Sequence, residues 1–126
     1  MPKSLIEFGT VMPYVTTTTP SLITQILSSD PGTGDQTVLL THAPAREWGD
    51  PVCQHDYWEE AYIIEGRLYD KTLRQWFPAG SYCCRPPGML HGPYLADGTT
   101  GVKEICYLRY PRKEDRLEES VRPQSK

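Results

Sequence analysis

The chain has 126 residues, with 13 basic against 16 acidic side chains and a formal net charge of -3. Its length is enough for one hydrophobic core and short for two domains. Nucleic acid and membrane surfaces usually bind proteins with a basic excess, so the expected partner is a small molecule.

The location expected from the sequence is the cytoplasm. The first residues contain no apolar run long enough for a signal peptide, and no stretch of ~18 apolar residues suggests a membrane span. The chain has four cysteines, of which Cys83 and Cys84 are adjacent and would point to opposite faces of a strand. We therefore expect no disulfide framework. Cys83, Cys84 and Cys106 should pack, with a place on a pocket wall as the alternative for one of them.

The pattern along the chain predicts an all-β sandwich or barrel. Signals for helices are almost absent, and 12 prolines and 10 glycines separate short runs rich in Val, Ile, Leu, Thr and Tyr. The predicted strands, in chain order, are residues 21–27, 36–42, 60–65, 67–71, 81–85 and 102–110. Turn sequences rich in proline and glycine separate them at residues 30–35, 49–51, 78–80 and 97–98.

The two ends differ from this central region. Residues 1–20 include a threonine run, 16–19, and are expected to form an N-terminal arm or an edge strand. Residues 111–126 are mostly charged, so we expect a solvated tail or a short surface helix. The barrel is therefore assigned to residues 21–110.

Two motifs contain the candidate metal-binding residues. In the first, Cys53, His55 and Glu59 share odd parity, so an extended chain places all three on one face. An apolar strand ending at Gly66 follows and provides a rigid support. Converging Cys, His and Glu side chains are typical of metal coordination. The alternative is that Glu59 is a surface carboxylate and Glu60 points inward.

The second motif contains a histidine that follows a tight turn. Pro86 to Gly88 end one strand, and His91 begins the next segment, which should return it towards His55. His42, at the end of a predicted strand, is a further ligand candidate or a hydrogen-bonded part of the scaffold.

Together the motifs read C-x-H-x3-E-x6-G and G-x5-P-x-G-x2-H and resemble the two cupin motifs across residues 36–110. They look most like the cupin domains of ChrR-type anti-sigma factors, and like acetylacetone and dihydroxyacetophenone dioxygenases. The resemblance implies a cupin-type jelly-roll β-barrel (double-stranded β-helix) with one divalent metal ion. A homodimer is the assembly that it implies.

Carried over residue by residue, His55, Glu59 and His91 form a 2-His-1-carboxylate set. The chain departs from the family pattern at Cys53, which replaces the first histidine, and at Leu95, which replaces the trailing asparagine. If Cys53 binds, a tetrahedral Zn2+ site is favoured. If it does not, the open triad suits Fe2+, with Mn2+ or Ni2+ as alternatives.

The leading functional interpretation is a metal-dependent enzyme that acts on a small aromatic, enolisable or β-dicarbonyl molecule, most specifically a dioxygenase. A metal-dependent isomerase, cyclase or decarboxylase is the alternative, with Glu59 or Tyr94 moving the proton. A non-catalytic zinc cupin that senses a ligand or redox state is another. The residues expected to shape the substrate pocket are Tyr57, Trp58, Arg85 and Tyr94.

Overall fold

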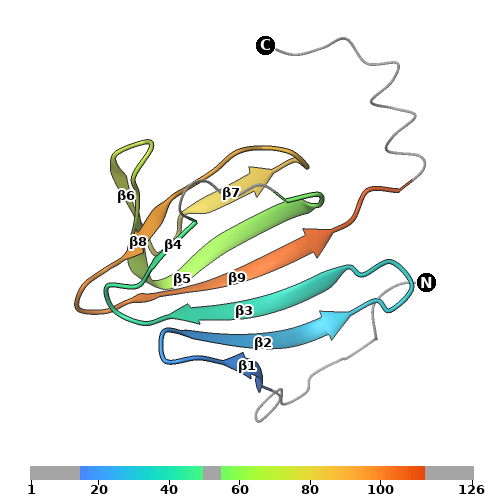
Figure 1. Cartoon of the computed structure of the whole chain (residues 1–126), viewed down its shortest axis with the longest axis horizontal. Helices are drawn as coiled ribbons and strands as arrows, with labels where there is room; N and C mark the ends of the chain where they lie inside the picture. Colours follow the sequence, from blue (N-terminus) through green and yellow to red (C-terminus); the bar gives the residue numbers. More distant parts are fainter. Residues whose placement is uncertain (1–14, 50–54, 113–126) are drawn as a thin grey trace.

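The computed structural model describes residues 15–49 and 55–112, and within these ranges every regular element is a strand (Figure 1). The predicted all-β class is therefore confirmed. The strands are β1 Val15–Thr18, β2 Leu22–Ser29, β3 Gln36–His42, β4 Glu47–Trp48, β5 Trp58–Asp70, β6 Gln75–Pro78, β7 Tyr82–Arg85, β8 Tyr94–Ala96 and β9 Val102–Arg109.

All strand pairs are antiparallel, and they follow the order β1-β2-β3-β9-β5-β8-β4, with β6 and β7 also pairing with β5. The 13-residue strand β5 is the centre of this arrangement. Its first half pairs with β9 and β7, and its second half pairs with β8 and β6. Figure 1 shows β1, β2, β3, β9 and β5 side by side, with the shorter strands gathered along β5.

A bend in β5 allows its first half to pair with β9 and β7 and its second half to pair with β8 and β6. Its register against β9 shifts between Ile63 and Glu65, which is the signature of a β-bulge. Gly66 follows with φ of 74°, and a Cβ there would lie 2.1 Å from the carbonyl oxygen of Gly101. The sequence predicted two strands separated at Gly66. The structure keeps one strand, because the bulge absorbs the turn without ending the pairing with β9.

The core lies on the inward face of this strand. Ala61 and Ile63 are each 5% exposed, whereas Tyr62 and Ile64 are 47% and 40% exposed. This alternation is the period of a half-buried strand. It places odd-numbered residues inside before the bulge, and Glu59 therefore points into the interior.

Two buried clusters fill the interior. One comprises Ile63, Leu68, Tyr94, Ala96 and Val102, with Trp48 and Phe77 packed against it. The other comprises Val38, Ala61 and Cys106, with Ile26, Leu40, Cys83 and Leu108. In the described part of the chain Cys83, Cys84 and Cys106 form no disulfide. The same residues include no helix with the length and apolar character needed to cross a membrane.

Candidate metal centre

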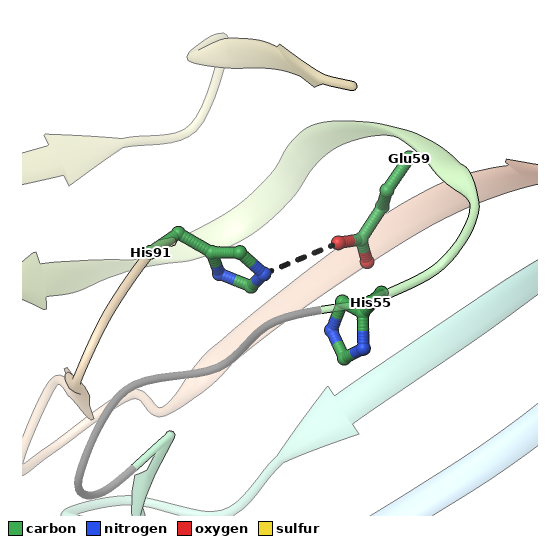
Figure 2. Close-up of side chains that lie close together, drawn as sticks. All are labelled: His55, Glu59 and His91. Carbon is green, nitrogen blue, oxygen red and sulfur yellow. Dashed lines mark ion pairs between the residues drawn. The ribbon is translucent and has the colours of Figure 1, made fainter. Parts of the chain in front are cut away.

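Three side chains converge at the start of β5: His55, Glu59 and His91 (Figure 2). Each offers one ligand atom, and these atoms all lie within 4.8 Å of one another. His55 comes from the segment just before β5, Glu59 from β5 itself, and His91 from the connection between β7 and β8. The proline-glycine turn joins the two motifs directly, because the Gly88 amide donates a hydrogen bond of 2.8 Å to the carbonyl oxygen of His55.

His91 presents a buried nitrogen to this group. Its side chain is 9% exposed, and Nε2 lies 4.0 Å from Glu59 Oε1. Within the described residues that nitrogen has no hydrogen-bond partner. A buried polar atom without a partner is costly, so its orientation towards Glu59 and His55 fits a metal ligand.

The protonation of His91 also suits coordination. Burial lowers the pKa of its imidazole to about 4, with the charges of Arg85 and His55 adding to the effect. The ring is therefore neutral near pH 7, which is the form that binds a metal.

Glu59 is held by an arginine from the neighbouring strand. Glu59 on β5 and Arg85 on β7 are cross-strand partners, and Arg85 Nη1 donates to Glu59 Oε1 at 2.9 Å. Both side chains are largely buried, at 13% and 15% exposed. The second guanidinium nitrogen, Nη2, donates to Tyr94 Oη at 2.9 Å. Tyr94 Oη also lies 2.9 Å from His91 Nδ1, so Arg85 and Tyr94 link two of the candidate ligands.

The ring of His55, the third candidate ligand, stacks on an aromatic side chain. The His55 ring lies parallel to Tyr57, with centroids 4.8 Å apart and an interplanar angle of 6°. Tyr57 in turn contacts Tyr110 edge-on at 5.2 Å. Burial, followed by the charge of Glu59, raises the pKa of Tyr57 well above its usual range. Its hydroxyl therefore stays neutral beside the site.

A cavity of about 420 Å³ reaches the site at His91, the one of the three candidate ligands that lines it. Its wall is mainly apolar and includes His91, and of the four residues expected to shape a substrate pocket, Arg85 and Tyr94 line it. Tyr57 and Trp58 do not belong to that lining, because Tyr57 stacks on His55 and Trp58 lies with Arg109 over its ring at 5.9 Å.

The structure places the remaining candidates elsewhere. His42 is not part of the ligand group; its Nε2 is hydrogen-bonded to Glu104 Oε2 at 2.7 Å. Cys53 lies outside the described residues, as does the predicted tail beyond Arg112. The sequence analysis did not single out Glu104. Its signal is a carboxylate at an inward position of β9, in alternation with Val102 and Cys106.

The curled antiparallel barrel with a two-histidine, one-glutamate cluster in its interior defines a cupin. The family model described as "ChrR Cupin-like domain" matches residues 5–105, and the chain belongs to that family. The predicted resemblance and jelly-roll fold are thereby confirmed. A comparison with curated protein sequences finds no match.

Solved cupin structures share the fold at low sequence identity. An RmlC-like cupin from Shewanella frigidimarina superposes with a TM-score of 0.64 at 17% identity, covering 90% of this chain and 98% of the other. An acetylacetone dioxygenase from Acinetobacter johnsonii gives 0.64 at 15%, covering 89% and 82%. The Rhodobacter sphaeroides complex of SigE with the anti-sigma ChrR gives 0.57 at 18%, covering 73% of this chain and 46% of the matched one.

Proposed function

We propose that this protein is a metal-dependent enzyme that acts on a small organic molecule through oxygen atoms of that molecule. The observation that carries the proposal is the three ligand atoms within 4.8 Å of one another, beside a cavity of about 420 Å³. A set of two histidines and one carboxylate would leave coordination positions of a divalent ion open for a substrate. His55, Glu59 and His91 would hold the ion.

A divalent ion in this place supplies Lewis acidity, which lowers the pKa of a bound enol or water, and iron adds chemistry with O2. The chain's own residues orient the candidate metal ligands. Because Nε2 of His91 must be unprotonated to coordinate, its Nδ1 carries the proton and donates it to Tyr94 Oη. Arg85 Nη2 also donates to that oxygen. The Tyr94 hydroxyl therefore accepts two hydrogen bonds, one of them from a candidate metal ligand.

The mainly apolar wall of the cavity, with His91 on it, favours a mostly apolar substrate with oxygens at one end, such as an aromatic, enolisable or β-dicarbonyl compound. O2-dependent cleavage or oxidation is the most specific version of the proposal. Its support is the open 2-His-1-carboxylate set together with the shared fold of an acetylacetone dioxygenase.

A second candidate needs no O2. The observation that favours it is the hydroxyl of Tyr94 on the cavity wall, 2.9 Å from both His91 Nδ1 and Arg85 Nη2, where it can move a proton. The metal would then stabilise an enolate during isomerisation, cyclisation or decarboxylation. A structure of the polyketide cyclase RemF from Streptomyces resistomycificus shares the fold, with a TM-score of 0.58 at 17% identity.

A third candidate is a non-catalytic zinc cupin that senses a ligand or redox state. The family's ChrR description supports it, and Cys53 as a zinc thiolate would supply an oxidisable switch. The Cys53→Ser variant separates this candidate from the others. Zinc that is lost in the variant favours the sensor, whereas metal retention favours the open triad.

The enzyme proposal is tested by reconstituting the protein with Fe2+ under argon and adding acetylacetone or 2,4'-dihydroxyacetophenone. O2 consumption that requires the substrate and is lost in His91→Ala supports the dioxygenase. Exchange of the substrate's acidic C–H for deuterium that is faster than without protein, is lost in His91→Ala and consumes no O2 supports the Lewis-acid version. If the loaded protein does neither with these or related enolisable ketones, the enzyme proposal is wrong.

A further inference from the structure

A second polar group stands on the cavity wall, away from the three candidate ligands. Glu104 on β9 lines the cavity, and its side chain is only 9% exposed. Glu59 pairs with Leu108, four residues farther along the same strand. At the rise of an antiparallel strand, that separation is about 13 Å along β9. Glu104 therefore lies at a different position along β9 from the one that faces Glu59, on a cavity wall that is mainly apolar.

The Glu104 carboxylate is oriented by a buried histidine. His42 Nε2 lies 2.7 Å from Glu104 Oε2, and Arg46 Nη1 lies 3.0 Å from His42 Nδ1. Because a guanidinium only donates, Nδ1 of His42 accepts the hydrogen bond from Arg46. Nε2 of His42 is then protonated and donates a hydrogen bond to Glu104. The His42 ring is fixed by stacking on Trp48, with centroids 4.0 Å apart and an interplanar angle of 7°.

The hydrogen bond from His42 occupies one of the two carboxylate oxygens of Glu104. Among the residues that the structure describes, the side-chain hydrogen bond of Glu104 goes to Oε2, which leaves Oε1 as the oxygen that can face the cavity. An acceptor on the wall of a mainly apolar cavity is expensive to leave unpaired when a ligand displaces water. A ligand that brings its own donor to this point therefore binds better than one that does not.

We propose that Glu104 is a ligand-binding residue that accepts a hydrogen bond from a hydroxyl or amino group of the substrate. The substrate class is then a small, flat molecule with metal-binding oxygens at one end and a hydrogen-bond donor at the other. This inference rests on the proposed function, because the metal centre fixes the first end. Buried His42, to which Arg46 is hydrogen-bonded, holds the carboxylate in position, and neither of the two lines the cavity.

The test compares two chelators that differ in one group. Kojic acid carries a hydroxymethyl group opposite its chelating oxygens, and allomaltol has a methyl group in the same place. Their affinities are measured by calorimetry on Co2+-loaded protein, with the cobalt absorption bands reporting chelation. The wild type should prefer kojic acid by about tenfold, which is the value of one good buried hydrogen bond.

Glu104→Gln should remove that preference. The glutamine carbonyl can accept the bond from His42, which leaves the amide as a donor facing the cavity. We expect a ratio of about one, or a preference for allomaltol. The matched control is Glu65→Gln, because that carboxylate is 69% exposed and should leave the ratio unchanged.

Each outcome decides the inference. A wild type that chelates both compounds with equal affinity, or a Glu104→Gln variant that keeps the preference, overturns the role of Glu104 and leaves the metal centre intact. A wild type that binds neither cobalt nor chelator overturns the proposed function, and this inference with it. The ratio of the wild-type affinities for kojic acid and allomaltol tests the inference even if the Glu104→Gln variant does not fold.

Discussion

Tyr94 is the residue that ties the site together. Its ring belongs to the core cluster with Ile63 and Val102, and it is only 4% exposed. Its hydroxyl contacts both His91 and Arg85, and Arg85 holds Glu59. The packing of one aromatic side chain thus fixes the orientation of two candidate ligands, which is the usual role of groups that support metal-binding residues.

Replacement of Tyr94 by Phe keeps the ring and removes the hydroxyl. We expect metal affinity to fall by about 10-fold to 100-fold, because the His91 Nδ1 proton and one Arg85 N–H lose their acceptor. Competition with a chromophoric chelator measures the change. Tyr62→Phe is the control, since Tyr62 is 47% exposed on the opposite face of β5. Equal affinities in the two variants would contradict this role.

The ligand residues were predictable, and their supports were not. Odd parity before a strand and a proline-glycine turn before a histidine indicated that His55, Glu59 and His91 meet. The contact between Glu59 and Arg85 depends on the register of β5 against β7, which a single sequence does not specify. The stack of His55 on Tyr57 likewise depends on how the segment enters the strand.

At the scale of elements, the bend in β5 is the feature on which both halves of the barrel depend. Gly66 has φ of 74° and stands where a Cβ would meet the Gly101 carbonyl oxygen at 2.1 Å. Since that oxygen belongs to the backbone, it cannot move aside cheaply. Gly66→Ala should lower the free energy of unfolding by at least about 2 kcal/mol.

Gly98→Ala provides the matched comparison for urea unfolding. A Cβ at Gly98 meets nothing within 4 Å, so the expected change is within about 0.5 kcal/mol. Similar stabilities for the two variants would mean that the backbone at Gly66 relaxes without strain.

The turn between β8 and β9 is organised by Asp97. Its Oδ1 accepts hydrogen bonds from the amides of Thr99 and Thr100 at 2.7 and 2.9 Å, and Oδ2 accepts one from Arg67 Nε at 2.6 Å. The bond from Thr100, then Arg67 and Thr99, holds the pKa of this carboxyl well below its usual range. The ionised form therefore stabilises the turn that leads into β9.

The pH dependence follows from that shift. A carboxyl whose pKa is lower in the folded state stabilises the protein fully above its unfolded pKa of about 3.9. This contribution is lost as the pH falls from that value towards the lower pKa of the folded state. Asp97→Asn should be less stable than the wild type at pH 7, with a smaller difference at pH 3. Urea unfolding at both pH values measures this. A difference that is constant with pH would show that the charge is not responsible.

Most of the strands were predictable from the sequence, and three of the short ones were not. Residues 36–42 were predicted with the bounds that β3 has, because β-branched and apolar residues between turns are a strong signal. Strands β4, β6 and β8 have only two to four residues, and no such pattern develops over that length. They form because β5 and one another offer them partners, which is tertiary information.

Across the whole molecule, the candidate metal centre brings together segments that are far apart in sequence. His55, Glu59 and His91 come from either side of β6 and β7, so a bound ion would bridge the two motifs. Zn2+ added at about 100 times its dissociation constant should raise the free energy of unfolding by about 2.7 kcal/mol. Chemical unfolding with and without the ion measures this, and the effect should be absent in His55→Ala.

His55, Glu59 and His91 are expected to bind a divalent metal, and the metal content of the purified protein, determined by mass spectrometry, measures this binding. The wild type should carry about one ion of iron, zinc, manganese or nickel per chain, and His91→Ala about one tenth of that or less. A wild type that contains no metal, even after incubation with each of these ions, would contradict the account. An equal content in His91→Ala would do the same.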